Sequence, residues 1–181
     1  GGKLGSMNLA SPEWGSVYSS SILGNSVPVA CGLALGKQVL HQPGVVINLL
    51  GDGAMEEGPF YEGLVFAKSH KLRYLIIVEN NDHSMWSTIE ERRAPISLSG
   101  MCASIGIEYS EFSGNDVHQY RSKLERVRSL ADEAKPTCVE VHLGALNNHS
   151  GPTPGWSADP MNISIQNGLV VEETERDPVY V

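Results

Sequence analysis

A Gly-Asp-Gly turn set between two apolar strands is the feature that most constrains this chain. Residues 45–50 (VVINLL) predict a buried strand that runs directly into Gly51-Asp52-Gly53. A helix-like segment follows at 60–71, and a second strand over 74–78 leads into Asn80-Asn81. Because a crossover helix makes the two strands parallel, their carboxyl ends should meet at one sheet edge, where ligands bind in open α/β sheets.

The two polar clusters at this edge offer the ligand atoms that hard divalent cations prefer. The Asp52 carboxylate and the Asn81 amide oxygen suit Mg²⁺ or Ca²⁺ that also carries phosphate groups. Each motif alone has a simpler explanation, because Gly-Asp-Gly and Asn-Asn are both common in tight turns. Their combination within one strand–helix–strand unit is more specific, and it predicts a metal and phosphate site.

The remaining pattern predicts an α/β domain built on a doubly wound parallel sheet. Strands and helices alternate along the chain, which favours right-handed crossovers with helices on both faces of the sheet. The further strands are expected at 107–112 and 136–143, and the further helices at 27–40, 96–105 and 117–134. We take 1–181 as a single domain, with 82–95 as an irregular binding loop and 144–181 as an irregular tail that contacts a cofactor or a partner.

Charge and composition exclude several classes of function. A net charge of −8 argues against a nucleic-acid surface, and no apolar stretch reaches the length of a membrane span. The charge is compatible with phosphate binding, because backbone N–H groups and a metal ion can neutralise phosphate. Cys31, Cys102 and Cys138 lack the spacing of a zinc site and predict buried, reduced thiols in a cytoplasmic protein.

The motifs resemble those of thiamin diphosphate enzymes, above all the alpha subunits of 2-oxo acid dehydrogenases and acetoin dehydrogenases. Gly51 to Glu62 resembles that family's GDGAxxEGxFxE motif, and Glu79-Asn80-Asn81 resembles its ENN. Residues 1–9 are similar to its GGKGGSMH segment, 21–24 to its stretch before a small-residue helix, and 148–150 to its GHS loop. The resemblance covers nearly the whole chain in order, and it implies the pyrophosphate-binding domain of the thiamin diphosphate-binding fold.

The resemblance also implies roles for single residues. Asp52, the Asn81 side chain and the main-chain carbonyl of His83 would ligate Mg²⁺. The implied cofactor-binding residues are Ile22, Leu23, Gly24, Gly51, Asp52, Gly53, Ala54, Asn81 and His149. Among these, backbone N–H groups of Gly53 and Ala54 would meet the diphosphate, and residues 22–24 would line the aminopyrimidine.

His149 is the one residue of this chain with a possible catalytic role. It would donate a hydrogen bond to the diphosphate, although a loop histidine in contact with solvent is the simpler alternative. The glutamate that starts the chemistry in this family is expected on a partner chain. Glu56 and Glu57 are explained by the positive end of the following helix, and Glu62 is a candidate for a partner contact or a proton path.

The implied function is that of a pyrophosphate-binding subunit in a decarboxylating 2-oxo acid dehydrogenase. The enzyme would cleave or transfer a two-carbon or acyl unit from a 2-oxo acid or ketol, together with a separate pyrimidine-binding, beta-like subunit. A homodimer or a heterotetramer would provide both walls of the site, and the helix over 27–40, with Gly32 and Gly36, is a candidate interface if it does not simply pack in the core. The alternatives are a split transketolase-like ketol transferase and a non-catalytic thiamin diphosphate-binding subunit.

Three departures from the family pattern reduce the cationic contacts expected at the diphosphate. Asn8 stands in place of the family's SMH histidine, and Ala145 stands where an arginine precedes GHS. The family's upstream Tyr-Arg pair has no counterpart in this sequence. Either another polypeptide supplies these contacts or Mg²⁺ and backbone donors carry the affinity, so we expect a split enzyme or a fragment of a longer one.

Overall fold

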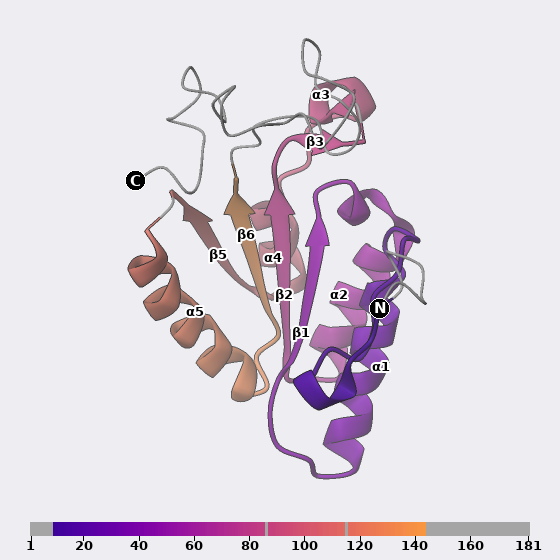
Figure 1. Ribbon diagram of the computed structural model, residues 1–181, viewed down its shortest axis with the longest axis vertical. Helices are drawn as coiled ribbons and strands as arrows, with labels where there is room; N and C mark the ends of the chain where they lie inside the picture. Colours follow the sequence, from indigo (N-terminus) through magenta and orange to yellow (C-terminus); the bar gives the residue numbers. More distant parts are fainter. Residues whose placement is uncertain (1–8, 86, 115, 144–181) are drawn as a thin grey trace, which may run out of the picture.

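A parallel sheet forms the centre of the computed structural model, which describes residues 9–85, 87–114 and 116–143 (Figure 1). Its strands lie in the order β1-β2-β6-β5. They are β1 (Val46–Gly51), β2 (Tyr74–Asn80), β5 (Glu108–Ser113) and β6 (Thr137–His142). Each neighbouring pair is parallel, so all four carboxyl ends meet at one edge of the sheet.

Helices cover both faces of the sheet, which confirms the doubly wound α/β architecture (Figure 1). On one face lie α1 (Ser26–Val39), α2 (Gly58–Ser69) and α4 (Leu98–Ile105), and on the other lies α5 (Val117–Asp132). In the part of the chain that the structure describes, no helix is both long enough and apolar enough to cross a bilayer. The short elements are η1 (Pro12–Trp14), η2 (Ala54–Glu56), β3 (His83–Ser84), β4 (Ser87–Thr88) and α3 (Ile89–Arg92).

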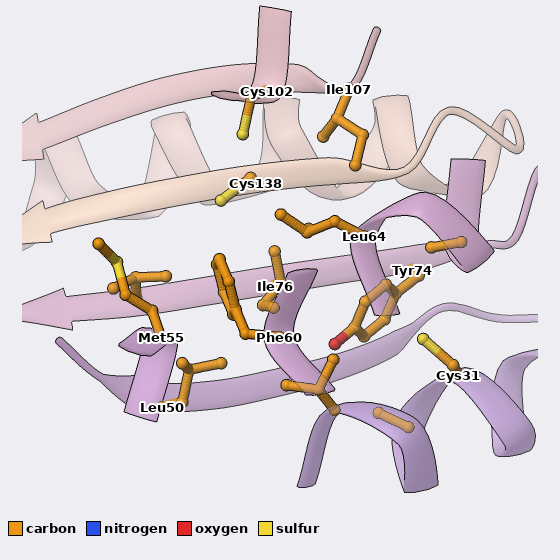
Figure 2. Packing of buried hydrophobic residues seen from close by; sticks show 14 of the residues in the cluster. Cys31, Leu50, Met55, Phe60, Leu64, Tyr74, Ile76, Cys102, Ile107 and Cys138 are labelled. Atoms are coloured by element: carbon orange, nitrogen blue, oxygen red, sulfur yellow. The ribbon is translucent and has the colours of Figure 1, made fainter. Parts of the chain in front are cut away.

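Strand β2 separates two apolar clusters because its side chains alternate between the faces of the sheet. Tyr74, Ile76 and Val78 join the cluster beneath α1, α2 and α4, whereas Leu75 and Ile77 join the cluster beneath α5. Figure 2 shows the first cluster. Burial of both faces explains why this strand is a continuous apolar run in the sequence rather than an alternating one.

The three cysteines are buried free thiols, as expected. Cys102 of α4 and Cys138 of β6 lie close together in the larger cluster (Figure 2). Cys31 lies on α1, and burial raises the pKa of its thiol to about 11. At neutral pH this thiol is therefore protonated and behaves as a small apolar core residue.

The structure corrects the expectation for the segment after β2 and answers part of the question about the helix over 27–40. The segment 82–95 is not irregular, because it holds the β3–β4 hairpin and the capped helix α3. The helix over 27–40 packs in the core through Val27, Ala30, Cys31 and Ala34, while nothing lies within 4 Å of a Cβ placed on Gly32 or Gly36. Their role at a subunit interface stays a prediction, and the tail over 144–181 lies outside the described residues.

At Gly63, α2 lies close against the side chains of α1. A Cβ at Gly63 would overlap the Val27 side chain and lie 3.6 Å from the Cys31 sulfur atom. Gly58, at the start of the same helix, is exposed and has nothing within 4 Å of the corresponding position. The two glycines thus form a matched pair for testing the packing of the helices.

We predict that Gly63→Ala lowers the free energy of unfolding by about 1–3 kcal/mol, the usual range for overpacking a core. Gly58→Ala should leave it unchanged or raise it by about 0.4–1 kcal/mol, because alanine restricts the unfolded chain. Urea denaturation measures both. Val27→Ala should rescue part of the Gly63→Ala loss, and equal effects of the two glycine substitutions would contradict this account of the contact.

Candidate functional site

Asp52 lies directly beyond β1, at the carboxyl edge of the sheet. The parallel register pairs Gly51 with Glu79, and the Asp52 amide extends the ladder by donating to the Glu79 carbonyl over 3.1 Å. Only 1% of Asp52 is exposed. Asn81 directly follows the neighbouring strand β2, so the polar groups predicted to form the site do follow adjacent strand ends.

The Asp52 carboxylate is paired with Arg92, a residue that the sequence motifs did not identify. One guanidinium nitrogen of Arg92 lies 2.6 Å from Asp52 Oδ2 and 3.0 Å from Glu56 Oε1. Arg93 reaches the same Glu56 oxygen over 2.9 Å. The Arg92 side chain is 13% exposed. Two carboxylates and two guanidinium groups therefore form one largely buried ion cluster beside the Gly-Asp-Gly turn.

Neighbouring charges hold Arg92 in its protonated form. Burial alone would lower the pKa of the guanidinium, but the hydrogen bonds and charges of Glu56 and Asp52 outweigh burial and raise it. Arg92 also donates through Nη1 to the Ser87 carbonyl. Within the described residues, the hydrogen bonds of this side chain go to carboxylate and backbone oxygens, which suits a rigid multiple donor.

The short helix α3 positions Arg92 over the turn. Its N-cap is Thr88, whose hydroxyl accepts from the Glu91 amide while the Glu91 carboxylate accepts from the Thr88 amide over 2.8 Å. That backbone hydrogen bond lowers the pKa of Glu91. The Ile89 amide donates to Asp82 Oδ1 over 3.2 Å, which ties α3 to the residues after β2. The pattern Thr88-x-x-Glu91 is a capping-box signal from which this helix start is predictable.

Glycine allows two other segments to approach the turn closely. A Cβ on Gly53 would overlap the Ser84 side chain, so the β3–β4 hairpin lies against the turn. A Cβ on Gly24 would lie 2.6 Å from Glu57 Cβ, and Gly24 has a φ of +72° that favours glycine. The bend at 22–24 therefore packs beside η2, with Ile22 and Leu23 largely exposed.

The adjacent asparagines Asn80 and Asn81 have different partners. Asn80 Nδ2 donates to Glu140 Oε1 over 2.8 Å, and the other Glu140 oxygen accepts from the Tyr109 hydroxyl over 2.7 Å. Burial, together with Glu140, raises the pKa of Tyr109. Asn81 Oδ1 accepts from the His83 amide over 3.1 Å, which forms a turn within the segment. Asn80 therefore joins β2 to β6, while Asn81 lies past the strand end.

Within the described residues, no cluster of three or more His, Cys, Asp or Glu side chains is placed to hold a metal ion. The predicted ligand set does not require one, because it combines the Asp52 carboxylate with an amide oxygen and a main-chain carbonyl. His149 lies outside the described residues.

A cavity of about 400 Å³ lies at the opposite, amino end of the sheet. It contains none of the residues predicted to form the site. Its lining comes mainly from the end of α1 and the turns before β1 and β2, with Lys37, Lys71 and Arg73 among the residues. Neither its position nor its residues connect it with Asp52.

Comparison with known proteins relates most of this sequence to one family of dehydrogenase subunits. The family model described as the dehydrogenase E1 component matches residues 1–157. The pyruvate dehydrogenase E1 component subunit alpha of Zymomonas mobilis is 32% identical over 97% of this chain and 51% of its own length. The corresponding Rhizobium meliloti protein is 33% identical over 98% of this chain and 50% of its own length. The chain thus spans about half the length of these curated relatives.

Solved structures share the fold. A transketolase from Campylobacter jejuni aligns with a TM-score of 0.61 and 22% identity, covering 68% of this chain and 20% of its own. A putative thiamin diphosphate-dependent enzyme from Mycobacterium smegmatis aligns with a TM-score of 0.54 and 20% identity, covering 70% of this chain and 23% of its own. The α/β architecture is therefore the one found in thiamin diphosphate enzymes, as the motifs predicted.

We predict that Asp52→Asn destabilises the metal-free protein by about 1–3 kcal/mol, because it removes a charged partner from the largely buried Arg92. Glu56 remains as a partner, which limits the loss. The matched control is Asp132→Asn, which affects a half-exposed pair with Arg73 at 3.9 Å and should change stability by at most about 1 kcal/mol. Chemical denaturation of both variants measures the difference. Equal effects would show that the buried pair contributes no more than a surface one.

Proposed function

We propose that this chain, which belongs to the dehydrogenase E1 component family, forms the diphosphate-binding wall of a thiamin diphosphate site. The observation that carries the proposal is the buried Asp52 carboxylate at the end of β1, next to the strand that leads into Asn81. A carboxylate that is 1% exposed needs a positive partner, which Arg92 provides in this structure and which a bound metal ion would also provide. Carboxylate, amide and carbonyl oxygens together suit Mg²⁺, which usually binds phosphates as well.

The proposed ligands of Mg²⁺ are Asp52, the Asn81 side chain and the His83 main-chain carbonyl. Gly53 and Ala54 would present backbone N–H groups to the diphosphate at the start of η2, where helix geometry leaves amides without partners. His149 would add a donor from the tail, and residues 22–24, which pack beside η2, would line the aminopyrimidine.

The proposed reaction is the decarboxylation of a 2-oxo acid. Thiamin diphosphate supplies, when bound, the nucleophilic carbon and the electron sink for that reaction. This chain would orient the cofactor through its diphosphate end. The pyruvate dehydrogenase names of its relatives support a 2-oxo acid substrate.

The same relatives are named as alpha subunits, which supports a separate beta-like partner. We assign to that partner the pyrimidine-binding wall and the glutamate that activates the cofactor, within a homodimeric or heterotetrameric assembly. The buried free thiols fit a reducing, cytoplasmic setting.

We predict that the complete protein, together with its native partner, binds thiamin diphosphate only when Mg²⁺ is present. Asn81→Ala should weaken binding by about tenfold or more, because it removes a metal ligand. The matched control is Asn80→Ala, which removes the bond to Glu140 and should lower stability while binding stays dependent on Mg²⁺.

Calorimetric titration measures the affinities, and thermal unfolding measures the stabilities. Absence of heat with the native protein would refute the cofactor assignment. Equal losses of affinity in the two asparagine variants would refute the assignment of Asn81 as the ligand.

A further inference from the structure

The Asp52 carboxylate, proposed above as a metal ligand, is already paired with a cationic side chain, the guanidinium of Arg92. Arg92 contacts Asp52 Oδ2 at 2.6 Å, shorter than its contacts to Glu56. This contact is supported from several directions, since Glu56, the Ser87 carbonyl and the cap of α3 all fix the arginine. The arrangement is therefore a built ion pair rather than a chance surface contact.

A divalent metal ion and a guanidinium cannot share this carboxylate without cost. Both are cations, and they would lie within a few ångströms of each other where little water screens their repulsion. The ion cluster of Asp52, Glu56, Arg92 and Arg93 is neutral, so a metal ion would leave it with excess positive charge. If Arg92 withdraws, Asp52 becomes free to ligate the metal.

We propose that Arg92 is an internal counter-cation that competes with the metal ion for Asp52. This inference rests on the proposed function. In the metal-free protein Arg92 neutralises the buried carboxylate and keeps the turn folded. Metal binding displaces the guanidinium from Asp52 and leaves it paired with Glu56, which accepts from it independently.

The chain geometry links this exchange to the other proposed ligands. The segment 81–92 has Asn81 and His83 near its start and Arg92 at its end. Ser84, which belongs to this segment, lies against Gly53. The bond from the Ile89 amide to Asp82 joins the two ends of the segment. Release of Arg92 from Asp52 therefore loosens the hold of α3 and the hairpin on the turn, so that metal occupancy and the position of this segment are coupled.

The test is the affinity for Mn²⁺ alone, which prefers the same oxygen ligands as Mg²⁺ and whose free concentration is measurable by electron paramagnetic resonance. The complete protein with its native partner is compared with Arg92→Gln. Removal of a competing cation should tighten Mn²⁺ binding by about fivefold or more, within the usual range of coupling between two ligands.

Arg93→Gln is the matched control. Arg93 bonds to Glu56 and to the Ala94 carbonyl rather than to Asp52, so its loss should tighten Mn²⁺ binding by less than the loss of Arg92 does. Unchanged or weaker binding by Arg92→Gln would overturn the inference. If Asp52→Asn abolishes binding in that case, the proposed function still stands. If neither the native protein nor Arg92→Gln binds Mn²⁺, both proposals fail.

A measurement on the native protein covers the case in which Arg92→Gln does not fold. Hydrogen exchange followed by mass spectrometry should show faster exchange in peptides over 87–93 when Mn²⁺ is added, because α3 loses its contact with Asp52. Peptides from α5, which lies on the other face of the sheet, should not change. Slower or unchanged exchange over 87–93 would contradict displacement of Arg92.

Discussion

The parallel pairing of β1 with β2 is the constraint on which the site depends. Gly51 opposite Glu79, followed by the bond from the Asp52 amide to the Glu79 carbonyl, fixes where β1 ends and the turn begins. Because the strands are parallel, the residues after β2 come out at the same edge. The apolar clusters on both faces hold these strands in place, so the packing of the core determines the position of residues that contribute nothing to the core.

Burial of a carboxylate is the second constraint, and it organises the segment after β2. A charge with almost no exposure is costly unless a counter-charge is close. Arg92 provides that counter-charge from α3, a helix too short to be stable by itself. The helix is stabilised by its N-cap, by the hydrogen bond from Ile89 to Asp82 and by the ion pairs of Arg92. One electrostatic requirement, a counter-charge for the buried Asp52 carboxylate, therefore accounts for both the polar surroundings of Asp52 and the fold of the hairpin.

The sequence predicted the sheet well because apolar runs report burial directly, as β2 shows. It placed the end of that strand too early, since Glu79 and Asn80 are polar yet still pair with β6. It also missed α3, although the pattern Thr88-x-x-Glu91 marks the start of that helix, and it missed Arg92, because the ion-pair partner of Arg92 lies 40 positions away along the chain. Local patterns reveal elements, whereas long-range ion pairs follow only from the fold.

The hydrogen bonds that Asn80 and Tyr109 donate to Glu140 have a consequence for Asn81, the residue after Asn80. These three side chains link β2, β6 and β5, and the bond from Asn80 restrains the backbone from which Asn81 projects. A residue held in this way loses its conformational entropy when the protein folds. Less entropy is then left to lose when a ligand arrives, and this preorganisation raises affinity without any added contact.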